Sequence, residues 1–359
     1  MNSPIAKILV LSDGKPGHYN QSLGIIDRFD NIYTQTIQII FKKKWRDNLI
    51  RIFGYIFGGL RVSNWLIASV LRWALDKSSA NELLNARDFD LILSTGSSVA
   101  SPNLLMSNMI KAKSVVCTRP SPLGIRHFDL AILPEHSRPR KIPQNVVMTF
   151  GVPNRITPKS VRSAGLDLSQ KNSISDKRII GILLGGDDPY YNIPADMASS
   201  LSDILLDICN QINTQIAITT SRRTYDSAEE ILKSKLKDDP ACCFFVSAKE
   251  SNQGGVVQGI LGISNIAIVT EDSFSMVCES ASSGKKTIIL DVERKRKKPY
   301  SRREKVYKLL VEQSYARRSN LQNLKTGLIN YMNDRSKPKA LNDAEVAAKA
   351  LKQLLDSFS

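Results

Sequence analysis

The chain has 359 residues, and its 50 Lys and Arg against 34 Asp and Glu leave a formal net charge of +16. This length suits two domains that each bury an apolar core, and the composition is that of a soluble globular protein. The five cysteines form no C-x-x-C pair, which excludes a zinc ribbon and a disulfide scaffold and favours the reducing cytoplasm. The positive surplus favours nucleic acid, anionic lipid or a phosphorylated substrate as a partner, and charge alone does not choose among them.

The first apolar run, at residues 5–11, predicts a buried strand that leads into the loop Ser-Asp-Gly-Lys-Pro-Gly. No charged segment followed by a long apolar stretch precedes this strand, so we expect no secretory signal. A helix that begins near residues 18–20 would complete the opening βα unit of a Rossmann-like domain. The loop lacks the G-x-G-x-x-G fingerprint, so NAD binding gains little support.

Polar groups are concentrated in this loop, at the carboxyl end of a strand, where open α/β sheets bind their ligands. The residues concerned are Asp13, Gly14, Lys15, His18, Asn20 and Gln21. They predict a ligand site in the first domain. The alternative is a plain turn in which Asp13 and Asn20 only satisfy backbone groups.

Residues 41–75 combine many aromatic and cationic side chains. Arg51, Arg61 and Arg72 interrupt the apolar stretches, so no segment reaches the roughly 20 residues needed to cross a bilayer. Cations beside tryptophan and phenylalanine suit helices that lie in the headgroup plane of an anionic membrane. A pair of amphipathic helices whose aromatic residues belong to the core explains the pattern equally well, so both interpretations stay open.

Three further buried strands are predicted near residues 89–95, 113–117 and 128–134, and each ends in small or polar residues. Helix-length sequence separates the first two, so the parallel α/β pattern continues. The residues that would join the opening loop at the carboxyl edge of the sheet are Thr95, Gly96, Arg119, Glu135 and His136. Each of them also fits a plain strand end. Residues 146–150 resemble the last strand of this half.

The pattern restarts after residue 177. A buried strand at 178–184 opens on Gly185, Gly186 and Asp187, and the glycines would let a ligand approach the backbone closely. A second strand-like run, at 215–219, is followed by hydroxyl and guanidinium groups suited to phosphate. These groups belong to Ser221, Arg222, Arg223 and Thr224.

Residues 266–285 predict a nucleotide-binding clamp. A short buried strand leads into a turn rich in acids and hydroxyls and then into a helix that ends near Gly284. The free N–H groups and the positive dipole end of such a helix favour a diphosphate. Ser275 and Glu279 would share one face, with the carboxylate about 5.4 Å deeper, where it can meet ribose hydroxyls. An ordinary capped helix explains the same pattern. The predicted contacts are Asp272, Ser273, Ser275, Met276 and Glu279.

Residues 293–305 contain eight basic and two acidic side chains. Most runs of this kind are solvated loops. If the segment projects toward the ligand site, it could hold an anionic acceptor.

Five motifs occur in order between residues 12 and 280: Ser-Asp-Gly-Lys-Pro-Gly-His-Tyr-Asn-Gln-Ser-Leu-Gly, Phe-Asp-Leu-Ala-Ile-Leu-Pro-Glu-His, Gly-Gly-Asp-Asp-Pro-Tyr-Tyr, Thr-Ser-Arg-Arg-Thr and Thr-Glu-Asp-Ser-Phe-Ser-Met-Val-Cys-Glu-Ser. Together they resemble the mitochondrial fission ELM family, whose bacterial members are regarded as glycosyltransferases of the GT-B architecture. The resemblance implies an α/β fold of two Rossmann-like domains with parallel sheets facing across a cleft. Residues 1–157, with a C-terminal helix at 340–359, would form the acceptor domain, 158–177 a linker, and 178–339 the nucleotide-sugar domain.

The resemblance also implies an activity. A sugar would move from a nucleoside-diphosphate-sugar to a cell-envelope glycan or lipid acceptor, of lipopolysaccharide or lipooligosaccharide type, by a cytoplasmic enzyme that is peripheral on the inner membrane. No metal ion and no cofactor would be needed, because the helix dipole and basic residues offset the charge of the departing diphosphate. Asp13 or His18 would be the general base, and the pattern does not decide between them. The acceptor side would use Gly14, Lys15, Asn20, Gln21, Thr95, Gly96 and Arg119, and the nucleotide sugar the groups at 185–187, 221–224 and in the clamp.

The main alternative is a different class of protein. A non-catalytic adaptor could keep the fold and use its basic, aromatic surface to recruit partners at a membrane. Retention of both polar loops argues against this alternative. Nucleic-acid binding rests on charge alone, since no recognisable module supports it.

Overall fold

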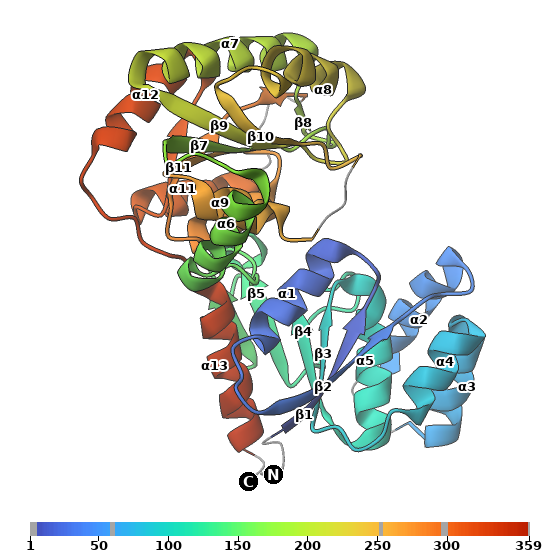
Figure 1. The fold of residues 1–359 in the computed structure, drawn as a ribbon. Coiled ribbons are helices and arrows are strands. Elements are labelled where there is room, and N and C mark those ends of the chain that lie inside the picture. Colours follow the sequence, from blue (N-terminus) through green and yellow to red (C-terminus); the bar gives the residue numbers. More distant parts are fainter. Residues whose placement is uncertain (1–5, 58–61, 251–253, 296–300, 358–359) are drawn as a thin grey trace. The chain divides into compact units, whose positions relative to one another are not determined.

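The computed structural model describes residues 6–57, 62–250, 254–295 and 301–357. The chain forms two compact units, Met1–Arg155 with Asp343–Ser359 and Ile156–Asn342. Each unit is built on a six-stranded sheet in which neighbouring strands run parallel (Figure 1). Two α/β units with parallel sheets are the arrangement that the alternation of buried strands and helices predicts, and this prediction is confirmed.

In unit 1 the strands pair in the order β2-β1-β3-β4-β5-β6. They are β1 (Ala6–Ser12), β2 (Ile32–Gln38), β3 (Leu91–Thr95), β4 (Lys113–Cys117), β5 (Leu130–Pro134) and β6 (Val146–Thr149). The helices are α1 (Pro16–Ile26), α2 (Lys44–Phe57), α3 (Asn64–Ala74), α4 (Lys77–Asn85), α5 (Ser97–Ile110) and α13 (Asp343–Asp356), with a 3₁₀ turn at Glu135–Ser137.

Strand β1 shows why this sheet is covered on both faces. Its side chains alternate, so that Leu9 and Leu11 pack with helices α2 to α5, while Ile8 and Val10 pack with α1 and α13. Helix α13 therefore belongs to the core of unit 1, although unit 2 separates it from the rest of unit 1 in the sequence (Figure 1). At its first turn the Asp343 carboxylate accepts hydrogen bonds from the backbone N–H groups of Phe150 and Gly151, at 2.9 and 2.7 Å.

The start of one helix in unit 1 differs from the prediction. Helix α1 begins at Pro16 rather than at residues 18–20, because proline has no N–H to satisfy in a first turn and its fixed φ is already helical. Within the described part of residues 41–75 lie the two helices α2 and α3, and each has a buried and an exposed apolar face. The predicted interruption at Arg61 lies outside the described residues.

In unit 2 the order is β10-β9-β7-β11-β12-β14, and β8 and β13 form a separate antiparallel pair. The strands are β7 (Arg178–Leu183), β8 (Tyr191–Asn192), β9 (Thr214–Thr219), β10 (Cys242–Val246), β11 (Ile266–Thr270), β12 (Lys286–Leu290), β13 (Glu293–Arg294) and β14 (Arg317–Ser319). The helices are α6 (Pro158–Asn172), α7 (Ala195–Ile212), α8 (Asp226–Leu232), a π-helical turn (Lys233–Lys237), α9 (Val256–Ile263), α10 (Phe274–Ser282), α11 (Ser301–Glu312) and α12 (Leu321–Asn333).

The segment predicted as a linker, 158–177, is instead largely helix α6, which packs on α9 within unit 2. Thr157 caps the helix, since its Oγ1 accepts from the backbone N–H of Ser160 at 2.9 Å. The contact between the two helices is made by backbone at Gly165 and Gly262, where an added Cβ would lie 2.6 and 2.0 Å from backbone atoms of the other helix. A helix that packs through glycine needs few large apolar side chains, so its sequence resembles a polar linker.

Candidate functional site

The opening loop of unit 1 brings together Asp13 and His18. The Nδ1 atom of His18 lies 2.9 Å from Oδ2 of Asp13, whose side chain is only 5% exposed. Burial alone would raise the pKa of Asp13, but the hydrogen bond and charge of His18, the Lys15 backbone N–H and the Lys15 ammonium lower it below 3.8. An ionised Asp13 holds the proton of His18 on Nδ1 and leaves Nε2 as a proton acceptor. The partly exposed histidine can thus act as an oriented base.

Gly96 makes room for this pair. It precedes α5 with φ 99° and ψ 162°, a conformation that essentially only glycine adopts. A Cβ at Gly96 would lie 2.6 Å from Nδ1 of His18 and 3.5 Å from Oδ2 of Asp13. The residues at the carboxyl ends of β1 and β3 are therefore fitted to each other, as the sequence predicts for a site at this edge of the sheet.

The other residues predicted for the acceptor differ in their exposure. Lys15 is exposed, and its Nζ lies 3.3 Å from Asp13; Gly14 forms the exposed turn at φ 77°. Asn20 is partly exposed and Arg119 is exposed.

Two of the residues predicted for the acceptor form hydrogen bonds inside the protein. The hydroxyl of Thr95 is buried 2.8 Å from that of Ser22. The side-chain oxygen of Gln21 is buried and accepts from the thiol of Cys117 at 3.8 Å. These bonds connect helix α1, which follows the opening loop, to strands β3 and β4.

Thr118, which lies beside Arg119 just after β4, could not be recognised as a site residue from the sequence. Its φ is 71°, in the left-handed region that β-branched residues rarely occupy. Backbone strain of this kind clusters at ligand sites, and it lies here at the same edge of the sheet as Gly96.

In unit 2 the diglycine loop is held by the protein itself. An added Cβ at Gly185 would lie 2.1 Å from the Asp272 carboxylate, and one at Gly186 would lie 2.2 Å from the backbone of Arg223. Both glycines therefore leave room for atoms of the protein itself, and their approach to a ligand stays a prediction.

Asp272 and Thr224 are also turned inward. Asp272 is buried and accepts from the Gly186 N–H at 2.8 Å and from the Arg223 guanidinium at 3.0 Å. Burial raises its pKa despite these bonds. Thr224 Oγ1 donates to the Gly185 carbonyl at 2.5 Å. These residues, predicted to contact the nucleotide, join the loops after β7, β9 and β11.

The guanidinium of Arg223 is likewise occupied, since it also donates to the carbonyls of Gly186 and Asp187 at 3.2 and 2.9 Å. Ser221 accepts from the Arg223 N–H at 3.2 Å, and the Asp187 carboxylate pairs with Lys295. Arg222, at the carboxyl end of β9, is exposed, as is Arg223.

Helix α10 presents the predicted clamp. Its N-cap residue, Ser273, makes no capping hydrogen bond with its side chain, so this side chain does not occupy the backbone N–H groups of Ser275 and Met276 in the first turn. Ser275 in the first turn is exposed and Met276 is partly exposed.

Glu279 lies one turn further along α10. Burial raises its pKa from 4.5 to about 7. Within the described part of the chain no cation faces this carboxylate. A partly buried acid without a cationic partner is suited to accept hydrogen bonds from neutral hydroxyl groups.

A network of charged residues around the loop between β11 and α10 was not predicted from the sequence. The buried Glu271 accepts from Arg318 at 2.8 Å, and the hydroxyl of the buried Tyr307 donates to the Glu271 carbonyl at 2.5 Å. Arg303 on α11 donates to Asp188 and to the Asp272 carbonyl, both at 2.9 Å. The pair Glu271-Asp272, two acids directly after a buried strand, was the one available signal.

This network corrects the prediction for residues 293–305. Arg294 faces Glu271 and Glu304, Lys295 pairs with Asp187, and Arg303 pairs with Asp188. These cations therefore hold unit 2 together rather than projecting as a solvated arm. Arg296, Lys297 and Lys298 lie outside the described residues.

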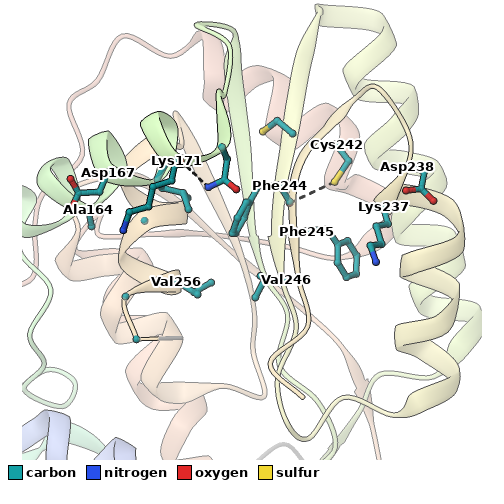
Figure 2. A pocket seen from close by; sticks show the side chains of 16 residues that line it. Ala164, Asp167, Lys171, Lys237, Asp238, Cys242, Phe244, Phe245, Val246 and Val256 are labelled. Carbon is teal, nitrogen blue, oxygen red and sulfur yellow. Dashed lines mark hydrogen bonds between the residues drawn. The ribbon is translucent and has the colours of Figure 1, made fainter. Parts of the chain in front are cut away.

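A pocket of about 650 Å³ lies elsewhere in unit 2, between α6, the start of α9 and the edge strand β10 (Figure 2). Phe244, Phe245 and Val246 line it together with Lys171 and Lys237. None of the residues predicted for the nucleotide is part of its lining.

Comparison with known proteins adds to this geometry. The chain is 24% identical over 190 residues to Mitochondrial fission protein ELM1 of Arabidopsis thaliana, a match that covers 47% of this chain and 43% of that protein. It is 29% identical over 142 residues to the uncharacterized protein RP120 of Rickettsia prowazekii, covering 39% of this chain and 38% of the relative. The matched regions thus span less than half of each relative.

Solved structures resemble the fold over nearly the whole chain. UDP-GlcNAc 2-epimerase from Methanocaldococcus jannaschii matches with a TM-score of 0.60 and 13% identity, over 98% of this chain and 99% of that one. The enzyme from Neisseria meningitidis, solved bound to UDP-GlcNAc, matches with a TM-score of 0.56 and 13% identity, over 98% and 100%. The predicted GT-B-like fold of two Rossmann-like domains is confirmed by this likeness, which shows the fold alone. The profile of the family described as Mitochondrial fission ELM1 matches residues 16–355, and the chain therefore belongs to that family.

Proposed function

We propose that this protein is a glycosyltransferase that uses a nucleoside-diphosphate-sugar and needs no metal ion or cofactor. The observation that carries the proposal is the Asp13–His18 pair, an oriented base at the carboxyl edge of the first sheet. A protein that only binds partners does not require a histidine with a fixed tautomer and a glycine that makes room for it. The two epimerases of similar fold act on UDP-GlcNAc according to their names, and this supports a nucleotide sugar as the donor.

The donor would bind at the start of α10. The diphosphate would take the backbone N–H groups of Ser275 and Met276 with the hydroxyls of Ser273 and Ser275, and the exposed guanidinium of Arg222 would balance part of its charge. Glu279 would accept hydrogen bonds from the ribose hydroxyls. Asp272 and Arg223 fix the loops that shape this site.

In the transfer step the acceptor hydroxyl oxygen bonds to the anomeric carbon of the sugar. Its proton passes to Nε2 of His18, while Asp13 stabilises the imidazolium that forms. The bond from the anomeric carbon to the diphosphate breaks, and the diphosphate leaves with the electron pair. The positive end of α10 offsets the charge of this leaving group.

For the acceptor we propose a cell-envelope glycan or lipid of lipopolysaccharide type, reached by a cytoplasmic enzyme at the inner face of the membrane. The net charge of +16 supports an anionic acceptor. Lys15, in the loop after β1, and Arg119, in the loop after β4, are exposed cations at the predicted acceptor edge.

The test is transfer of labelled sugar from a panel of nucleotide sugars to a membrane extract. His18→Ala should lower turnover by about 10²-fold or more, the usual contribution of a positioned base, and should leave nucleotide affinity unchanged. His127→Ala is the matched control, because His127 contacts Arg126 and lies outside the opening loop. Transfer by His18→Ala within twofold of wild type would refute the assignment.

A non-catalytic adaptor remains the second candidate, favoured by the name of the Arabidopsis relative. An adaptor would show no transfer and no thermal stabilisation by any nucleoside diphosphate. An enzyme should gain about 2.7 kcal/mol at a ligand concentration a hundred times its Kd.

A further inference from the structure

Helix α2 carries apolar side chains on two opposite faces. On the inner face Ile50 and Gly54 are buried, and an added Cβ at Gly54 would lie 2.9 Å from Ser101 of α5. On the outer face Trp45, Leu49, Ile52 and Ile56 follow one another at intervals of three or four residues, so they form one stripe. Each of these four is 45% to 55% exposed. Packing of α2 against the rest of unit 1 uses only the inner apolar face, so the outer stripe is not explained by the core.

Helix α3 extends the same surface. The ring of Trp73 lies 5.5 Å from that of Trp45 in an edge-to-face contact, which joins the exposed sides of the two helices. Trp65, at the start of α3, is 77% exposed, and Leu66 beside it is also exposed. We call the exposed side chains of Trp45, Leu49, Ile52, Ile56, Trp65, Leu66 and Trp73 the α2–α3 surface.

Cations border this surface, and among the described residues no ion pair is formed by Lys42, Lys43, Lys44, Arg46 or Arg72. The Arg46 guanidinium lies over both Trp45 and Trp73, at 5.2 and 5.0 Å from the ring centres, and donates to the Trp73 carbonyl. Lys42 donates to the Arg72 carbonyl at 2.6 Å. Residues 42–46 read Lys-Lys-Lys-Trp-Arg, and the one acidic residue of residues 41–75, Asp47, is buried and paired with Arg51.

We propose that the α2–α3 surface docks on an anionic lipid bilayer. The apolar stripe would enter the boundary between headgroups and acyl chains, the tryptophans would lie at headgroup level, and the lysines and Arg72 would meet lipid phosphates. A bilayer explains this surface better than a partner protein with a groove. The two tryptophans Trp45 and Trp73 already pack against each other, and the cations lie around them rather than around one cavity. None of the helices in the described residues combines the length and the apolar character that a membrane span requires.

Helix α2 also connects this surface to the proposed acceptor edge. On its inner side Arg51 forms a bidentate pair with Asp47 and donates to Ser98 at 2.8 Å, in the first turn of α5. That turn directly follows Gly96, which contacts His18. A docked α2 would therefore hold the base of unit 1 close to the lipid surface, where a lipid-linked acceptor lies.

This inference deepens the proposed function by naming the surface and the lipid charge, and its test measures no sugar transfer, so either can fail alone. The full chain is sedimented with vesicles of phosphatidylcholine, with and without phosphatidylglycerol, at low and high salt. Wild type should sediment with the anionic vesicles only, and less so in high salt. Replacing Leu49, Ile52 and Ile56 together by Gln should weaken the partition at least about tenfold.

Replacing Lys42, Lys43 and Lys44 by Gln should weaken it by about a hundredfold at low salt, at roughly fivefold for each charge. Two matched triple variants serve as controls on other exposed positions and should bind as wild type does: Ile142, Leu166 and Val346 to Gln, and Lys159, Lys177 and Lys349 to Gln. Circular dichroism should show that every variant is folded.

Three results would overturn the proposal. Wild type could fail to bind anionic vesicles, the control triples could lose as much binding as the test triples, or binding could ignore lipid charge. Sedimentation equilibrium separates a further case: a dimer that the Leu49, Ile52 and Ile56 variant abolishes would make a second copy the occupant of the surface.

Discussion

The Glu279→Gln variant is expected to be more stable than wild type at neutral pH and to bind a nucleoside diphosphate more weakly. In wild type, burial raises the pKa of Glu279 from 4.5 to about 7. At about 1.36 kcal/mol per pH unit, this difference corresponds to about 3 kcal/mol by which the fold disfavours the ionised form. The figure is an upper value, because the side chain keeps some contact with water.

The sign of the change in stability with pH follows from the linkage between protonation and folding. The folded state holds the proton of Glu279 more tightly than the unfolded chain, so this group favours folding below pH 4.5 and loses that contribution as pH rises to about 7. Glutamine does not titrate. Urea unfolding at a series of pH values should therefore show the variant gaining on wild type between pH 4.5 and 7, with a constant difference above pH 7.

Nucleotide binding should respond in the opposite sense. Ribose hydroxyls donate to an ionised carboxylate, so the affinity of wild type for a nucleoside diphosphate should rise with pH up to about 7 more than that of the variant. Loss of the charged acceptor should weaken binding by about 1 to 3 kcal/mol above pH 7, measured by calorimetry. The ionisation of the ligand's phosphate affects the affinity of both proteins equally, so it cancels in the difference between wild type and variant.

Two outcomes would refute this reasoning. If wild type and variant keep the same stability difference at every pH, the carboxylate is not held neutral by the fold. If stability behaves as expected while nucleotide affinity is equal in both proteins, Glu279 is buried but lies outside the ligand site.

Three other substitutions test the geometry. Gly96→Ala should cost about 1 to 3 kcal/mol of stability through its backbone conformation, and it should lower sugar transfer without changing nucleotide affinity, as assayed by urea unfolding and turnover; normal turnover would contradict the fit of glycine to the base. Asp272→Ala should destabilise unit 2 by about 1 to 3 kcal/mol, because a buried backbone N–H loses its acceptor, whereas Asp167→Ala on the exposed face of α6 should stay within about 0.5 kcal/mol. Gly262→Ala should lower the free energy of unfolding by about 1 to 3 kcal/mol, because the added methyl group separates α6 from α9. Gly17→Ala is the control, and it should be neutral or slightly stabilising because nothing lies within 4 Å of the added methyl group. Equal thermal midpoints for the two variants would show that the contact between α6 and α9 does not depend on glycine.

The strands could be predicted because parallel strands are buried on both faces and appear in the sequence as continuous apolar runs. The run at 178–184, for example, became β7 at Arg178–Leu183. Helix α6 could not be recognised in the same way. Its contact with α9 depends on backbone approach at Gly165, and a contact without side chains leaves no apolar period in the sequence.

The loops of the candidate site could also be predicted, since polar residues follow buried strands. Which way each side chain turns could not. Thr224 and Asp272 both point at the diglycine loop because β9 and β11 flank β7 in the sheet, and that order is not visible along the chain. Partners far apart in sequence, such as Glu271 and Arg318, stayed hidden for the same reason.

Because helix α13 returns to unit 1, the core of unit 1 is completed only after unit 2 has been synthesised. During synthesis the whole of unit 2 emerges before α13, so unit 2 has all its strands while unit 1 still exposes the apolar face of Ile8, Val10 and Ile25. A fragment that stops at residue 155 should therefore expose that face and aggregate. A fragment of residues 156–342 should fold alone, and a peptide spanning residues 343–357, added in trans, should rescue the shorter fragment by covering its open side.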